Sequence, residues 1–145
     1  MPVFPSVEWF QAVADVVNKD PEYRHLGTCD ARVGMEVGEQ VFIINFEAFE
    51  IAAITRTTLD HKEDLDFTLV LPPEQWEAMI RNIKAHGRAE LDYTLNSIDL
   101  GTATEFARAD DYYRRDLFYR FNQSFQHFFD ASAKIETQFA EPARR

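Results

Sequence analysis

The side chains best suited to acid–base or nucleophilic chemistry are few in this sequence and lie far apart in it. They are the histidines His25, His61, His86 and His127 and the single cysteine, Cys29. None of them belongs to a G-x-S-x-G, H-E-x-x-H or C-x-x-C motif, and the sequence has no Gly-rich phosphate loop. We therefore expect no catalytic site, no metal site and no cofactor, and we expect that the protein is not an enzyme.

His127 precedes Asp130 by three residues, a spacing at which a carboxylate can orient a histidine that acts as a general base. A surface contact between helix neighbours is the simpler interpretation of this spacing. Cys29 has no identifiable base near it, and we interpret it as a small buried side chain.

Asp110 and Arg114 are four residues apart, so on a helix they form a ready ion pair. A carboxylate that faces an apolar pocket has a raised pKa and can move protons, although carboxylates early in a helix commonly interact only with the helix dipole. If the pair faces inward, it is the natural polar anchor for a ligand head group. One hypothesis for the function is therefore a cofactor-free isomerase or lyase that uses Asp110 or His127 as its proton carrier.

The segment Glu105–Phe139 is unusually aromatic, with seven of the thirteen phenylalanines, three of the five tyrosines, and no Gly or Pro. It predicts one long C-terminal helix with an aromatic stripe along one face. The stripe consists of Phe106, Tyr113, Leu117, Phe121, Phe125, Phe128, Ile135 and Phe139, with Phe118 and Phe129 on one flank and Asp110 and Arg114 pointing into it. Such a stripe can be the core side of the helix, the wall of a ligand cavity, or a dimer interface.

The rest of the chain must position this stripe. Hydrophobic periodicity predicts a helix from Ser6 to Asp20-Pro21 and a second helix from Pro72-Pro73 to His86-Gly87. An alternating pattern predicts a strand over Ala31–Val37, and Gln40–Glu47 predicts a central strand because both of its faces are apolar. Two more strands are expected at Glu50–Arg56 and Asp66–Leu71, with a polar loop over residues 57–64. Residues 88–100 are ambiguous. This order predicts an α+β protein in which helices cover one face of a largely antiparallel sheet.

Composition limits the classes of function. The length of 145 residues fits one domain, Met1–Arg145. The net charge is −10, with thirteen acids and five bases before Phe67, which disfavours binding to nucleic acid or to anionic membranes. A single cysteine, the lack of a signal peptide at the start and the lack of a long apolar run predict a cytoplasmic protein without stable membrane insertion.

The first 85 residues resemble the sterol carrier protein 2 family in its stand-alone bacterial form. The resemblance rests on Phe4–Phe10, on Asn18–Arg24 at the end of the first helix, and on the strand pair Ala31–Val37 and Val41–Phe46. It continues through Asp66–Leu71, which leads into Pro73-Glu74-Gln75-Trp76. After Ile83 the sequence departs from the family, because Asp92–Ile98 replaces the usual fifth strand.

The resemblance implies a sheet of about five strands backed by helices, with an apolar tunnel between the sheet and the C-terminal helix. It also implies non-covalent binding of lipids, acyl chains, sterols or similar hydrophobes without a cofactor. We expect a small binding or carrier protein for such a molecule. The expected lining residues are Phe46, Phe67, Leu69, Met79, Ile80, Phe118, Phe121, Phe125 and Phe128, with Asp110 and Arg114 as the polar anchor. The alternative is a non-catalytic subunit that docks on a partner protein, or on a second copy, through its aromatic helix.

Overall fold

The computed structural model describes residues 2–58, 65–90, 93–95, 98, 107–109 and 112–139. The chain opens with the short strand β1 (Val3–Phe4) and the helices α1 (Val7–Asn18) and α2 (Pro21–His25). Ser6 caps α1 by accepting a hydrogen bond from the Trp9 backbone at 3.1 Å, as its sequence position predicts. The sequence patterns did not indicate α2, which Asp20 caps in the same way.

A five-stranded sheet forms the centre of the molecule, in the order β4-β3-β2-β5-β6. The pair β2–β5 is parallel and the other pairs are antiparallel, which confirms the predicted α+β class. The strands are β2 (Ala31–Val37), β3 (Gln40–Glu47), β4 (Glu50–Thr58), β5 (Phe67–Val70) and β6 (Ala107–Arg108). The strand β4 is two residues longer than the sequence predicts, and residues 59–64 of the predicted loop lie outside the described residues.

The sheet is apolar on its inner face and partly apolar on its outer face. Ile43 of β3 points to the outer face and is only 1% exposed, which confirms β3 as an interior strand. Gly34 of β2 lies beneath Leu65, since a Cβ atom at Gly34 would come within 2.8 Å of Leu65 Cδ1. The missing side chain at Gly34 therefore lets Leu65 cover the outer face.

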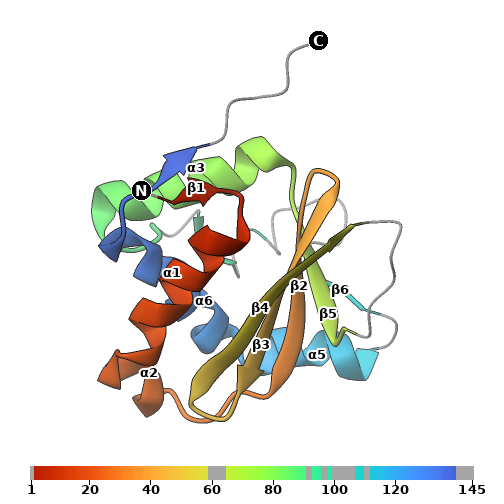
Figure 1. Ribbon diagram of the computed structural model, residues 1–145. Coiled ribbons are helices and arrows are strands. Elements are labelled where there is room, and N and C mark those ends of the chain that lie inside the picture. Colours follow the sequence, from red (N-terminus) through yellow and green to blue (C-terminus); the bar gives the residue numbers. More distant parts are fainter. Residues whose placement is uncertain are drawn as a thin grey trace.

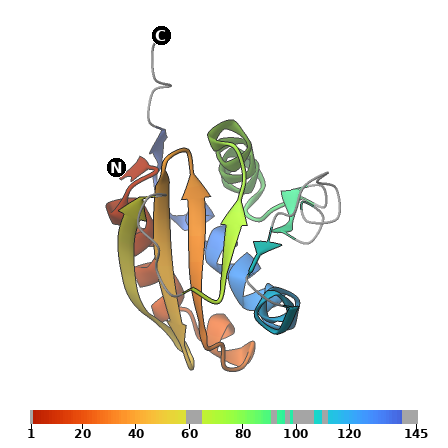
Figure 2. The same cartoon turned by 90° about the vertical axis from the view of Figure 1, so that its right-hand side faces the viewer.

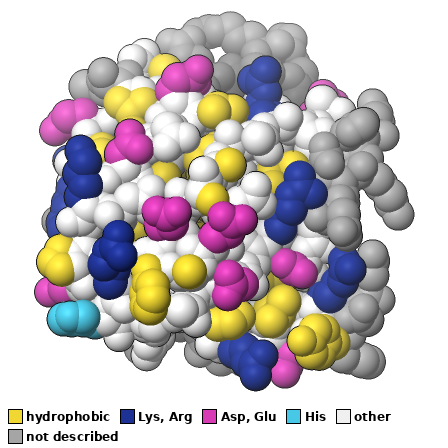
Figure 3. Space-filling model, turned by 60° about the horizontal axis from the view of Figure 1, so that its bottom comes forward, with side chains coloured by type: hydrophobic (Ala, Val, Ile, Leu, Met, Phe, Trp, Pro, Cys, Tyr) yellow, Lys and Arg dark blue, Asp and Glu magenta, His cyan; other side chains and the backbone are white. Residues whose placement is uncertain are grey.

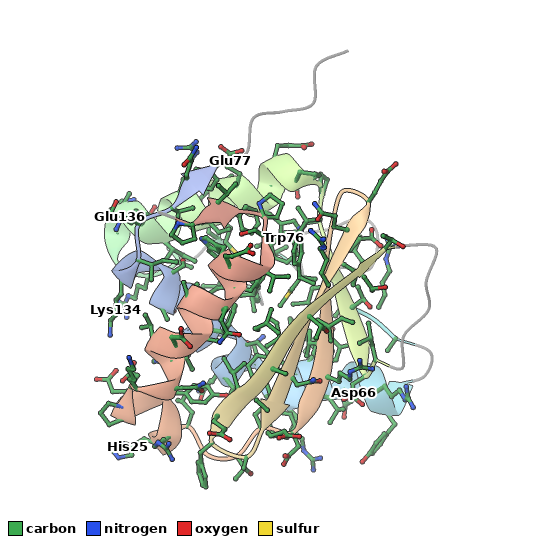
Figure 4. All side chains as sticks on the ribbon, viewed as in Figure 1. His25, Asp66, Trp76, Glu77, Lys134 and Glu136 are labelled. Atoms are coloured by element: carbon green, nitrogen blue, oxygen red, sulfur yellow. The ribbon has the colours of Figure 1, made fainter. Side chains whose placement is uncertain are left out.

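The helix α3 (Pro73–His86) follows β5 as predicted, with proline in its first turn and Gly87 as a left-handed cap at its end. Its buried stripe is Trp76, Met79, Ile80 and Ile83. Trp76 Nε1 donates a hydrogen bond to Glu36 O of β2 at 2.8 Å, so the helix is fixed to the sheet (Figure 4).

The predicted single C-terminal helix is wrong. The aromatic segment forms the helices α5 (Tyr112–Arg120) and α6 (Asn122–Asp130), the 3-10 turn η2 (Ala131–Lys134) and the strand β7 (Gln138–Phe139). The break lies at Phe121, whose backbone angles, φ −110° and ψ 20°, are not helical. Residues seven apart on a straight helix are separated by about 10 Å along its axis. The rings of Phe118 and Phe125 are instead stacked, with centroids 6.4 Å apart, so the break lets both rings pack on the sheet.

Two parts of the aromatic segment are strands because they find partners far away in sequence. Ala107 pairs with Leu69 at the edge of the main sheet, and Phe139 pairs with Phe4 of β1 in a separate two-stranded parallel sheet. The fifth strand of the main sheet therefore comes from the segment that periodicity assigns to a helix.

The molecule has two layers. Figure 2 shows β2, β3, β4 and β5 side by side in front, with α1 and α6 behind them, and Figure 1 shows α5 passing below the end of β5. The helices therefore cover one face of the sheet, as predicted. Across the described residues, none of the helices combines the length and the apolar composition that crossing a membrane requires.

Candidate functional site

Five phenylalanines pack together between the sheet and the two C-terminal helices. We call them the aromatic cluster: Phe46 of β3, Phe67 of β5, Phe118 of α5, and Phe125 and Phe128 of α6. The Phe125 ring lies 5.1 Å from that of Phe46 and 5.3 Å from that of Phe67, both edge-on. All five side chains are almost completely buried.

The other predicted lining residues have different surroundings. Leu69, Met79 and Ile80 are buried in the same continuous core as the aromatic cluster. Phe121 is only partly buried and lies at the break between α5 and α6. Eight of the nine predicted lining side chains are thus fully buried, and in the described residues the rings contact one another.

The predicted polar anchor is only half described. Asp110 lies outside the described residues. Arg114 is partly buried and its Nη1 donates a hydrogen bond to Leu65 O at 2.9 Å, just before β5. This bond joins α5 to the sheet beside the aromatic cluster.

The helix α5 is a thinly packed wall of the cluster. Among the α5 side chains that the structure describes, Phe118 alone is fully buried, whereas Tyr113 is 75% exposed and Tyr119 is 41% exposed. The Phe118 ring contacts Phe67 at 5.9 Å. Undocking of α5 would therefore uncover the cluster while exposing few other buried side chains.

The helix α6, by contrast, is fixed by polar contacts at several points. His127 Nε2 lies 2.9 Å from Asp20 Oδ2, which is 107 residues away in sequence. Asp130 accepts hydrogen bonds from Ala89 N and Gln126 Nε2, both at 3.0 Å. The predicted pairing of His127 with Asp130 is therefore wrong, because each of them has a tertiary or helical partner elsewhere.

The pairing of Asp20 affects its ionisation. Burial opposes the charged form, but hydrogen bonds from His127 and from the Glu22 backbone, together with the charges of His127 and Lys134, outweigh it. The pKa of the Asp20 carboxyl consequently lies below its ordinary value. The Asp20 carboxyl, which fixes α6 through His127, is thus ionised at neutral pH.

Two buried polar groups that sequence patterns did not single out as a site lie at the end of α2. Tyr23 is completely buried, and its hydroxyl has no hydrogen-bond partner among the described residues. Cys29 is buried and free, as expected, and burial together with the charges of Asp30 and Asp66 raises the pKa of its thiol to about 12. Burial and the neighbouring Cys29 likewise raise the pKa of Tyr23.

A separate surface groove of about 310 Å3 lies between α3 and β7. It is lined by Ile80, Arg81, Lys84, Ala85, Glu136, Thr137 and Phe139. Arg81 pairs with Glu77 at 2.7 Å, and Lys84 lies 3.6 Å from Glu136, so its charges are balanced locally. Glu77 and Glu136 lie along the same upper edge of the molecule in Figure 4.

In the described part of the chain, no group of three or more His, Cys, Asp or Glu side chains is placed to hold a metal ion. The face at the lower end carries hydrophobic side chains scattered among acidic and basic ones, not one continuous apolar surface (Figure 3).

Comparison with known proteins shows the fold. The structure is similar to the solution structure of a conserved hypothetical protein from Thermus thermophilus, described as a possible sterol carrier protein. The TM-score is 0.61 at 12% identity, over 90% of this chain and 88% of the other. No family model matches the sequence, and no curated protein matches it. The shared fold agrees with the resemblance in the first 85 residues.

Proposed function

We propose that this protein is a cytoplasmic carrier, not an enzyme, that binds a hydrophobic small molecule between its sheet and the helices α5 and α6. The observation that carries the proposal is the aromatic cluster beneath a thinly packed helix, in a fold shared with a possible sterol carrier protein. The proposed contacts are Phe46, Phe67, Leu69, Met79, Ile80, Phe118, Phe121, Phe125 and Phe128, with Asp110 and Arg114 as the proposed polar anchor.

The proposed binding step is a displacement of α5. The ligand replaces the ring contacts of Phe118 with Phe67 and Phe125, while α6 stays fixed by its contacts to Asp20 and Ala89. Affinity then comes from apolar area removed from water, at about 25 cal/mol per Å2 before ordering costs. No cofactor is required for this mechanism.

The first test is mass spectrometry of organic extracts from the purified protein, which identifies any hydrophobe that copurifies. The second test compares binding of a fluorescent fatty acid by Phe125→Leu and Phe129→Leu. Both residues are buried on α6, but Phe129 stacks on Trp76 of α3 at 5.6 Å and meets the aromatic cluster only edge-on, through Phe128 at 5.3 Å. Only Phe125→Leu should weaken uptake. Equal effects of the two substitutions on binding and stability would mean that the cluster is only core.

A second candidate function is that of an interaction subunit, and the exposure of Tyr113 and Tyr119 on α5 favours it. Exposed aromatic side chains are enriched in protein interfaces. Light scattering coupled to size exclusion distinguishes the two functions. An interaction subunit should form a dimer or a complex that Tyr113→Ser weakens, and apolar ligands should leave its melting temperature unchanged, whereas a carrier should be stabilised by them.

A further inference from the structure

We propose that the Tyr23 hydroxyl is the hydrogen-bond donor that holds the polar end of the bound molecule, and that this molecule is neutral. Its chemical class is a neutral hydrophobe whose polar group is an oxygen that accepts a hydrogen bond, such as a ketone, not a fatty acid. The inference rests on the proposed function, because it describes one end of the same site.

The Tyr23 hydroxyl lacks a partner that a buried polar group ordinarily has. The side chain is 0% exposed, and the hydroxyl forms no hydrogen bond within the described residues. Most buried side-chain polar atoms have a protein or water partner, because an unpaired hydroxyl in an apolar environment is costly. A ligand oxygen would satisfy it.

Tyr23 belongs to the same continuous buried core as the aromatic cluster. Its ring lies 5.7 Å from that of His127, which directly precedes Phe128 of the cluster on α6. Cys29, whose thiol lies near enough to affect the ionisation of Tyr23, extends β2 by donating from its backbone to Ala48 O at 2.9 Å.

The strand geometry supports the same placement. Cys29 comes two residues before Ala31, the first residue of β2, and both belong to the same continuous buried core as Tyr23. Ala31 is the cross-strand partner of Phe46, a member of the aromatic cluster. The hydroxyl and the cluster therefore border the same part of the core.

The charges around this position oppose an anionic ligand. Asp30 Oδ1 accepts a hydrogen bond from Ala48 N at 3.0 Å, and Asp66 Oδ2 accepts one from Arg32 N at 2.7 Å, so both carboxylates are held close to the segment that carries Cys29. Their charges oppose a second negative charge at the thiol. The nearby cation on η2, Lys134, lies 3.8 Å from Asp20, and His127 also pairs with Asp20. A neutral oxygen that only accepts hydrogen bonds avoids this repulsion and still pairs with Tyr23.

The test uses three probes of similar size: cyclododecanone, cyclododecane and dodecanoate. Binding to the intact protein and to Tyr23→Phe is measured by competition with a fluorescent hydrophobe. We expect Tyr23→Phe to weaken cyclododecanone binding by about 5- to 10-fold, the loss of one hydrogen bond, and to leave cyclododecane binding unchanged. Dodecanoate should bind the intact protein more weakly than cyclododecanone. As a matched control, Tyr113→Phe should change none of these affinities, because Tyr113 is largely exposed.

The possible failures are distinguishable. If no probe binds, both this inference and the proposed function are wrong. If the probes bind but Tyr23→Phe changes the affinities for cyclododecanone and cyclododecane equally, only the role of Tyr23 is wrong. Thermal unfolding gives an independent readout, because removing an unpaired hydroxyl should not lower Tm. A drop of several degrees in Tyr23→Phe would show that the hydroxyl already has a partner within the protein, which also overturns the inference.

Discussion

Replacing Phe118 by alanine should release α5 without unfolding the rest of the protein. Phe118 is completely buried, and its ring packs on Phe67 and Phe125 at 5.9 and 6.4 Å. Truncating a core phenylalanine ordinarily lowers the free energy of unfolding by about 3–5 kcal/mol. That full loss applies only if the whole structure depends on the ring.

The expected loss for Phe118→Ala is smaller, because the variant can let α5 undock. The loss is then limited by the free energy that docks α5, which is close to the cost of transferring one phenylalanine side chain to water, about 1.5–3 kcal/mol. Phe125→Ala serves as the comparison. Its ring contacts Phe46, Phe67 and Phe118, and α6 is fixed by Asp20, so we expect the full loss of about 3–5 kcal/mol.

Urea denaturation measures the free energy of unfolding of each variant, and native-state hydrogen exchange measures whether α5 stays docked. In Phe118→Ala, amides of Tyr112–Arg120 should exchange almost freely while those of Asn122–Asp130 keep their protection. Uptake of a hydrophobic probe should also become faster, since the aromatic cluster is then open. If Phe118→Ala costs as much as Phe125→Ala and α5 stays protected, then α5 belongs to the cooperative core and is not the movable wall.

Three further predictions concern the scaffold. Because the pKa of Asp20 is lower in the folded protein than its unfolded value of 3.8, its ionised carboxylate stabilises the fold at pH values above 3.8. This contribution is lost as the pH falls through the folded pKa. Asp20→Asn, which keeps a capping side chain but not the charge that faces His127, should flatten the dependence of Tm on pH in this acidic range. Gly34→Ala should lower the free energy of unfolding by about 1–2 kcal/mol, because the new methyl group meets Leu65. Urea denaturation measures this loss, and an unchanged urea midpoint would mean that Leu65 moves aside freely. The Asn18 side chain hydrogen-bonds both the N–H and the C=O of Ile51 on the edge strand β4, at 2.7 and 3.1 Å. Asn18→Ala should therefore increase concentration-dependent aggregation through this strand. Light scattering equal to that of the parent protein would contradict this role.

Local signals in the sequence determined most of the N-terminal half of the fold. Ser6 caps a helix because its side chain reaches a backbone N–H three residues ahead. Pro73 and Gly87 bound α3, because proline suits the first turn and glycine the left-handed cap. The alternation in Ala31–Val37 gives the bounds of β2, because a strand with one buried face has a period of two, and the apolar run in Gln40–Glu47 gives those of β3, which is buried on both faces.

For the aromatic segment, the sequence determined composition but not conformation. It contains no Gly or Pro, so nothing local marks the break at Phe121 or the strand at Ala107–Arg108. The break follows from packing two helices on one sheet, and the strand follows from pairing with β5, many residues earlier in the chain. Both are long-range contacts that periodicity does not contain.

The candidate site divides in the same way. The lining residues expected from the aromatic stripe and from the family resemblance include all five rings of the aromatic cluster, with Phe118 placed on the flank of the stripe. Only the tertiary structure decided that His127 pairs with Asp20, and that the buried Tyr23 hydroxyl near Cys29 finds no partner among the described residues. These relations depend on α2 meeting α6 across 107 residues of sequence, and a hydrogen-bond partner at that distance leaves no mark on local spacing.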